Sequence, residues 1–266
     1  MGFFDVFKGR GSQLGLKAYR MHVSGLQMRQ QGKYVEAKNK LDEAFEMYHK
    51  AYEAGFRKPA QLLAYAILTM QCGHFERARE LMLEVSKDKE LAREDRFTLR
   101  VNFAICQWKM GRLDKAIETI RLAAGEKVNG AIYTTLGMFL VEKARETGDF
   151  EEALRFNQEA LDYDDEDAAV LDNLGQLYLI MSDQCLKDGN REQAEQWRET
   201  AYQYLVKAHD EKGDQVTSIY YLAILEHERG NDERARELIE ERKKYVTTAL
   251  CPISDEEFAA LKARVS

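Results

Sequence analysis

The side chains that could bind a metal or act as a nucleophile are four cysteines and five histidines. They are Cys72, Cys106, Cys185, Cys251, His22, His49, His74, His209 and His227. The sequence contains no Cys-x-x-Cys, no His-Glu-x-x-His, no Gly-x-Ser-x-Gly and no phosphate-binding Gly-x-x-x-x-Gly-Lys-Ser/Thr. We therefore predict no enzyme activity, no catalytic residue, no cofactor and no metal. For the first three cysteines, which fall in predicted helices, we expect buried reduced thiols, with a metal or redox site as the alternative.

An internal sequence repeat indicates the secondary structure in which these residues lie. Six times a glycine is followed five residues later by an alanine, and successive glycines are 37 to 41 residues apart. The pairs are Gly32/Ala37, Gly73/Ala78, Gly111/Ala116, Gly148/Ala153, Gly189/Ala194 and Gly230/Ala235. Self-similarity at this period is typical of solenoids, in which each structural unit packs on its neighbours.

Each copy of the repeat predicts two amphipathic helices joined at the glycine, because apolar residues recur at three- and four-residue steps on both sides of it. Glycine adopts positive φ in the turn without a Cβ clash, and alanine allows two helices to approach closely. A second small residue lies in the first helix of every copy: Gly25, Ala66, Ala104, Gly137, Gly175 and Ala223. In copies four and five the distance from this residue to the turn glycine is longer by about one and two helical turns, so we expect longer helices there.

This pattern resembles the tetratricopeptide repeat (TPR) family, whose unit is a helix-turn-helix of 34 residues. The stretches that match include Leu136-Gly137 with Leu140, Asn173-Leu174-Gly175 with Tyr178, and Thr147 to Ala153 at a turn. The proline that usually closes a unit is missing, and Arg191 and Asp232 replace the aromatic residue after the last two turns. The resemblance implies an all-α, right-handed α-α superhelix of about six TPR-like helix pairs plus a C-terminal capping helix.

The sequence indicates three parts: an apolar segment and hinge at residues 1–17, the TPR-like array at 18–250 and the capping helix at 251–266. At the C-terminal helix, Ser254 and Glu257 have the spacing of a capping box. Phe258, Leu261 and Val265 follow at helical spacing and are expected to cover the last repeat, whose apolar face would otherwise be exposed.

The N-terminal segment combines an apolar cluster with a glycine-rich stretch. The cluster consists of Phe3, Phe4, Val6 and Phe7, and the glycines are Gly9, Gly11 and Gly15. Three interpretations remain open: the cluster packs on the first repeat or on a neighbouring molecule, it contacts a membrane surface, or it is disordered. The sequence also leaves open a homo-oligomer, formed through this cluster or through the lengthened helices of copies four and five.

The charge and hydropathy of the chain limit the kinds of partner and the cellular compartment that we expect. The formal net charge is −7 and the isoelectric point is about 5.5, which argues against nucleic acid as a partner because phosphates are bound largely by Lys and Arg. No apolar stretch approaches the ~20 residues of a membrane span. We therefore expect a protein or peptide partner and a cytoplasmic location.

The resemblance also implies where such a partner would bind, because in TPR proteins the first helix of each pair lines a concave groove that receives a peptide. Carrying that register across the copies gives these groove candidates: Leu63, Ile67, Met70, Val101, Asn102, Ile105, Trp108, Thr134, Met138, Val141, Asp172, Asn173 and Gln176. The middle of the groove is apolar, and Asn102 and Asn173 match a groove-edge asparagine that can pair with a peptide backbone. The alternative is that the apolar residues only pack neighbouring helices.

Two classes of function follow from this pattern. The first is a non-catalytic scaffold or adaptor that binds an apolar peptide segment in the concave groove. The second is a regulatory sensor or enzyme-associated subunit whose groove binds a short peptide or small ligand. A sensor of peptide termini needs charged groups in the groove, and Asp172 is the main carboxylate in that register.

Overall fold

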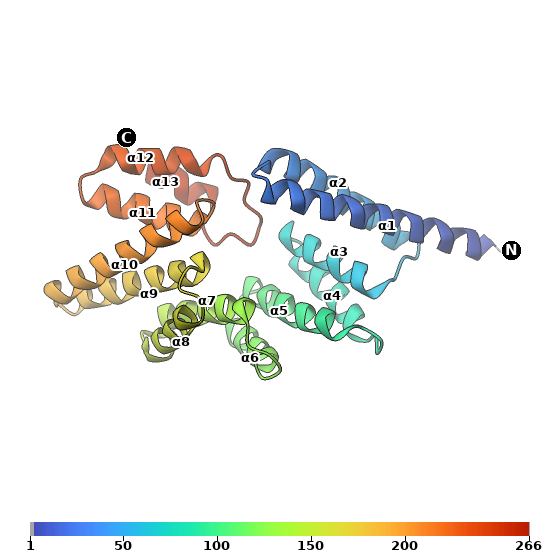
Figure 1. Cartoon of the computed structure of the whole chain (residues 1–266), viewed down its shortest axis with the longest axis horizontal. Helices are drawn as coiled ribbons and strands as arrows, with labels where there is room; N and C mark the ends of the chain where they lie inside the picture. The colour runs from blue at the N-terminus through green and yellow to red at the C-terminus, as the bar shows by residue number, and fades with distance from the viewer. Residues whose placement is uncertain (1–2, 266) are drawn as a thin grey trace. The chain divides into compact units, whose positions relative to one another are not determined.

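The computed structural model describes the backbone of residues 3–265 and the side chains of residues 11–265, and within this part of the chain it contains helices and no strands. The helices are α1 (Phe3–Gln30), α2 (Tyr34–Glu53), α3 (Pro59–Gln71), α4 (Phe75–Ser86), α5 (Arg93–Lys109), α6 (Leu113–Ala124), α7 (Gly130–Thr147), α8 (Glu151–Tyr163), α9 (Ala168–Lys187), α10 (Arg191–Glu211), α11 (Val216–Glu228), α12 (Asp232–Arg242) and α13 (Asp255–Val265) (Figure 1). Thirteen helices and no strands in the described residues confirm the predicted all-α repeat architecture.

The contacts divide the chain into two units, and the division falls between α5 and α6. The first unit contains Met1–Met110 and Thr248–Leu250, and the second contains Gly111–Thr247 and Cys251–Ser266. In the first unit α1 packs on α2, α3 packs on α4, and α3 also contacts both α1 and α5. In the second unit α7, α9 and α11 are consecutive neighbours, and each packs on its own second helix.

The turn glycines take the predicted left-handed conformation at all six positions, with φ between 73° and 87°. At Gly73 the turn is a Schellman motif: the Gly73 amide donates to the Met70 carbonyl over 2.9 Å and the His74 amide donates to the Thr69 carbonyl over 3.1 Å. At Gly148 a single bond of 2.8 Å from its amide to the Ala144 carbonyl ends α7. All six alanines that follow the glycines are buried, as a close approach of two helices requires.

The small residues of the first helices lie where the partner helix approaches. A Cβ on Gly25 would meet the Leu41 side chain at 2.8 Å, and one on Gly175 would meet Leu205 at 2.6 Å. Ala66, Ala104 and Ala223 are fully buried. This position therefore sets the distance between the two helices of a pair, as the sequence predicts.

Helix length follows the prediction only in part. The helices of the fifth pair, α9 and α10, have 20 and 21 residues, and α7 of the fourth pair has 18. The second helix of that pair, α8, has only 13 residues. The first pair is also long, with 28 residues in α1 and 20 in α2. The repeat spacing could not indicate this because α1 extends upstream of the repeat.

The predicted glycine hinge near the N-terminus is wrong in the described part of the chain, because α1 is continuous from Phe3 through Gly9, Gly11 and Gly15. Two of these glycines serve close packing instead. A Cβ on Gly11 would meet the Ala54 carbonyl oxygen at 2.5 Å, and one on Gly15 would overlap the Phe56 ring. Since Ala54 caps the end of α2, α1 extends beyond that end (Figure 1). The side chains of Phe3, Phe4, Val6 and Phe7 lie outside the described ones.

The C-terminal helix caps the second unit as predicted. The Ser254 amide donates to the Glu257 carboxylate over 2.7 Å, and the Glu257 amide donates to Ser254 Oγ over 3.2 Å, which is a capping box. Phe258, Leu261 and Val265 are buried in one apolar cluster with residues of α11 and α12. None of the described helices is long and apolar enough to cross a lipid bilayer.

Candidate functional site

The first helices of the first unit present a row of accessible apolar side chains. The row consists of Leu26 on α1, Ile67 on α3 and Ile105 on α5, each one residue after the small residue of its helix. Leu26 is 39% exposed, and the two isoleucines are half-buried, resting on the core of the unit. Because α3 contacts both α1 and α5, the row crosses three adjacent helices. We call these three residues the apolar row.

Trp108 lies one helical turn beyond Ile105 on α5 and is also half-buried. The Lys109 amino group lies 4.5 Å from the centroid of its ring, a cation–π distance. This aromatic side chain extends the partly accessible apolar surface beside the apolar row.

The structure divides the predicted groove residues into two groups. Six are half-buried and accessible from solvent: Ile67, Asn102, Ile105, Trp108, Thr134 and Met138. Seven are buried: Leu63, Met70, Val101, Val141, Asp172, Asn173 and Gln176. For the buried seven, the interpretation as packing residues fits better, because their side chains are at most 8% exposed.

The two predicted groove-edge asparagines bind the backbone of their own chain. Asn102 Nδ2 donates to the Thr98 carbonyl of the same helix over 2.8 Å. Asn173 Nδ2 donates to the Thr134 carbonyl over 3.2 Å and so joins α9 to α7. Asn173 is 5% exposed, so its side chain satisfies its own buried amide within the chain and is not free to pair with a peptide.

Asp172 is the buried carboxylate of the second unit, and three side chains of the chain itself surround it. It accepts hydrogen bonds from Gln176 Nε2 over 2.8 Å, Thr217 Oγ1 over 2.7 Å and Ser218 Oγ over 2.6 Å. Burial raises the pKa of Asp172, while these three hydrogen bonds act to lower it. Thr217 and Ser218 lie on α11, so the carboxylate ties α9 to the next first helix.

Sequence reasoning missed part of an accessible surface on α1. Leu16, Tyr19, Val23 and Leu26 are 42%, 38%, 36% and 39% exposed. Carried to the first repeat, the predicted groove register includes Tyr19 and Leu26, but it does not include Leu16 or Val23. Their steps of three, four and three residues would have identified one helical face.

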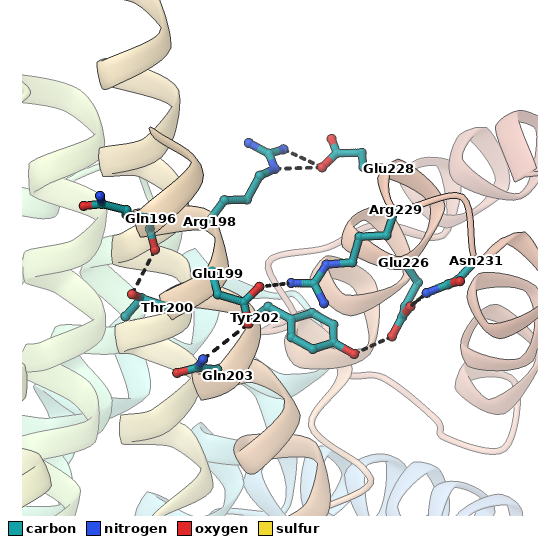
Figure 2. A network of polar contacts seen from close by, with 10 residues as sticks. All are labelled: Gln196, Arg198, Glu199, Thr200, Tyr202, Gln203, Glu226, Glu228, Arg229 and Asn231. Atoms are coloured by element: carbon teal, nitrogen blue, oxygen red, sulfur yellow. Dashed lines mark hydrogen bonds and ion pairs between the residues drawn. The ribbon is translucent and has the colours of Figure 1, made fainter. Parts of the chain in front are cut away.

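A polar network joins α10 to the end of α11 (Figure 2). Arg198 binds Glu228 with nitrogen–oxygen distances of 2.6 and 2.8 Å, and Arg229 binds Glu199 over 2.6 Å. The two ion pairs are reciprocal, since α10 supplies Arg198 and Glu199, and the end of α11 supplies Glu228 and its C-cap residue Arg229. Surface pairs of this kind contribute less than about 1 kcal/mol each, so the network determines register more than stability.

Tyr202 packs against Arg229 of this network. The guanidinium carbon of Arg229 lies 3.5 Å from the centroid of its ring, and its hydroxyl donates to Glu226 over 2.7 Å. Glu226, which is 7% exposed, also accepts a bond of 2.8 Å from Asn231 Nδ2 (Figure 2). These contacts join α10, α11 and the following turn, and we assign the network a structural role.

The cysteines differ in part from the expectation. Cys106 is buried as predicted, and its thiol lies 3.3 Å from the Phe75 carbonyl oxygen. Cys185 is half-buried, and Cys72 is exposed because it caps the end of α3 instead of lying inside the helix. Among the residues with described side chains, no three His, Cys, Asp or Glu side chains are grouped to hold a metal ion.

No protein-family model and no curated protein matches the sequence. Solved structures do. One is a chain in the crystal structure of the APC/C hetero-tetramer Cut9–Hcn1, with 14% identity and a TM-score of 0.57 over 98% of this chain and 49% of that chain. A second is PilF of Pseudomonas aeruginosa, with 16% identity and a TM-score of 0.46 over 93% of this chain and 97% of that one. A third is YrrB, a TPR protein with an unusual peptide-binding site, with 15% identity and a TM-score of 0.41 over 81% of this chain and 97% of that one.

The match to the Cut9–Hcn1 structure and the order of the helices agree on the fold: the chain has a TPR-like helical-repeat fold. The chain spans about half the length of the chain that it matches in that structure.

Proposed function

We propose that this chain is a non-catalytic interaction scaffold that binds an apolar segment of a partner protein across the first helices of its repeats. The observation that supports this most is the apolar row with Trp108 beside it. Its side chains lie on three adjacent helices of one unit, and each remains accessible to water.

Binding at the apolar row would be favourable because its side chains are in contact with water before a partner covers them. Burial of apolar surface contributes roughly 25 cal/mol per Å², so an apolar segment that covers the row gains free energy from several neighbouring side chains at once. A solenoid supplies such a surface because its stacked helices repeat one register position at each unit.

The alternative, a sensor of a short peptide or small ligand, has less support. Such a sensor needs a charged group in the groove that can reach its ligand. The strongest candidate, Asp172, is 3% exposed and already accepts three hydrogen bonds from its own chain. A ligand amine would have to displace those donors, so we favour the scaffold.

The proposal is tested with the partner that cross-linking and mass spectrometry identify in the native lysate. Ile105→Glu places a charge in the row and should weaken the measured affinity for that partner at least tenfold. Leu122→Glu is the matched control, because Leu122 is 67% exposed on α6, outside the row. Circular dichroism melting must show that both variants stay folded. Equal affinities of the two variants and the wild type would rule out the row as the binding surface.

A further inference from the structure

One face of α1 carries four exposed apolar side chains in one line, and we call them the α1 stripe: Leu16, Tyr19, Val23 and Leu26. They follow each other at steps of three, four and three residues, so they share one face of the helix. From Leu16 to Leu26 the helix rises about 15 Å, or close to three turns. This is the spacing that two helices use when their apolar positions interlock.

The stripe lies beside the face of α1 that packs on the rest of the unit. That packed face consists of Gly11, Gly15, Ala18, His22 and Gly25, which are all buried. Gly15 meets Phe56 and Gly25 meets Leu41. The stripe is offset by about one residue, or 100° around the helix, from this face. One long edge of the stripe is therefore bounded by the unit itself, and the other edge is open.

The open edge of the stripe is basic. Between Gly11 and Gln30 the helix has no Asp or Glu. Its charged residues beyond the open edge are Lys17 and Arg20, and a third, Arg29, falls in the register of the packed face. All three are exposed, and none forms an ion pair with the described residues. On the neighbouring helix α2, by contrast, Lys38 pairs with Asp42 over 2.5 Å and Lys40 pairs with Glu43 over 3.0 Å. A chain of net charge −7 thus keeps an unpaired positive edge next to an exposed apolar line.

We propose that the α1 stripe binds an amphipathic α-helix of a partner protein whose apolar positions are spaced by three and four residues and flanked by Asp or Glu. The proposal rests on the scaffold function and specifies its partner class. The apolar positions would interlock with the stripe, and the carboxylates would face Lys17 and Arg20. Charge complementarity of this kind contributes specificity and association rate.

Two other occupants fit the same observations less well. A second copy of this chain would place Lys17 and Arg20 near the same residues of the other copy, and this part of the helix has no carboxylate to offset the repulsion. A lipid surface favours a helix with basic residues along both edges of its apolar face, whereas one edge here is the packed face. The charge pattern therefore favours an acidic helix.

The test uses three synthetic helical peptides of about 18 residues with the same Leu positions and with Glu, Gln or Lys at the flanking positions. Binding of each labelled peptide to the full chain is measured by fluorescence anisotropy at low and at moderate salt. We expect the Glu peptide to bind at least tenfold more tightly than the Gln peptide, and the Lys peptide to bind more weakly than both. The advantage of the Glu peptide should decrease as salt increases, because exposed charges are screened.

Variants of the exposed residues separate recognition from folding. Leu16→Glu and Val23→Glu should each weaken binding of the Glu peptide at least tenfold. The double variant Lys17→Glu, Arg20→Glu should reverse the order of the peptides, so that the Lys peptide binds best. Leu122→Glu is the control and should leave all three affinities unchanged. A loss of structure alone would not reverse the order.

Several results would overturn the proposal. One is equal affinity for all three peptides, or no binding of any of them. Another is a wild-type dimer in sedimentation that Val23→Glu dissociates, which would assign the stripe to a second copy. A third is Val23-dependent co-sedimentation with phosphatidylserine vesicles together with no preference among the peptides. Leu16 and Val23 lie outside the apolar row, so the scaffold function would still stand if Ile105→Glu abolished binding of the native partner.

Discussion

Asn157 Nδ2 on α8 donates a hydrogen bond of 3.3 Å to the carbonyl oxygen of Gly137 on α7. The same nitrogen donates to the Ala153 carbonyl over 2.9 Å, and Asn157 is fully buried. Asn157 reaches the α7 backbone because Gly137 has no side chain: a Cβ there would collide with Asn157 Oδ1 and would lie 3.0 Å from Asn173 Nδ2. One glycine thus admits two buried amides.

We expect Gly137→Ala to destabilise the protein by about 1–3 kcal/mol, because an added methyl group in a packed site moves its neighbours off their preferred positions. The measurement is the free energy of unfolding by urea, followed by circular dichroism. The matched control is Gly130→Ala on the same helix, where a Cβ would meet nothing within 4 Å. That variant should be neutral or slightly stabilising, since Ala favours the helix.

The double variant Gly137→Ala, Asn157→Ala identifies the cause. If the collision with Asn157 causes the loss, the double variant should lose less than the sum of the two single variants. A Gly137→Ala protein as stable as the wild type would contradict the close approach itself.

The fold was predictable because each copy of the repeat contains two recognisable residues at a fixed spacing, one that forms the turn and one that packs between helices. A glycine with positive φ and a buried alanine five residues later recur six times, and both are local requirements that a sequence must satisfy at each copy. The N-terminal hinge was wrong for the same reason: glycine marks either a turn or a close approach, and the sequence alone does not distinguish them. Gly11 and Gly15 allow a close approach. The side chain that approaches Gly15 is Phe56, which is distant in sequence and so could not be inferred from the residues around Gly15.

The candidate site was less predictable, because the groove register of a residue does not determine how deeply its side chain is buried. Leu63 and Ile67 fall on the same predicted face of α3, yet Leu63 is 2% exposed and Ile67 is half-buried. Whether a residue in this register lines a surface or packs depends on the neighbouring helix. The same limit applies to Asp172, whose hydrogen-bond partners Thr217 and Ser218 come from the next repeat.

Substitution of Gly148 measures the backbone cost of a side chain in the turn, separately from any steric clash. Its φ is 74°, and an added Cβ would meet nothing within 4 Å, so the cost of a side chain comes from the backbone alone. We expect Gly148→Val to lower the free energy of unfolding by about 1–2 kcal/mol, and Gly148→Asn to lower it by less, because Asn adopts the left-handed region more readily. Gly125→Ala is the control, since Gly125 has a right-handed φ of −62°. Thermal melts of the three variants would show no difference if the turn conformation carried no cost.

His22 gives the first unit a pH dependence. It is 5% exposed, its ring lies 6.0 Å from that of Tyr48, and burial lowers its pKa from 6.5 to about 4. Between these two pH values the unfolded chain binds a proton that the folded chain does not, so His22 contributes less stability as the pH falls from 7 towards 4. We expect a loss of about 2 kcal/mol between pH 7 and pH 5 from this residue.

The measurement compares the wild type with His22→Leu by urea unfolding at both pH values. The variant should lose less stability than the wild type on going from pH 7 to pH 5, since carboxylates contribute equally to both proteins. Parallel losses in the two proteins would mean that His22 does not titrate differently in the folded state.

Trp108 separates the binding surface from the core most directly. Aromatic anchors often carry much of an interface's energy, and truncation of one that fills a desolvated pocket costs about 2 kcal/mol or more of binding. We expect Trp108→Ala to weaken binding of the native partner at least tenfold while the protein stays folded.

The control is Trp197→Phe, because Trp197 packs on Tyr178 with ring centroids 5.3 Å apart and lies against a core cluster. Since the chain has two tryptophans, this control also leaves Trp108 as the only indole, and its fluorescence should change when the partner binds. If Trp108→Ala instead lowers stability by the roughly 3–5 kcal/mol of a core cavity and the folded fraction binds its partner normally, Trp108 is a packing residue and the partner contacts another surface.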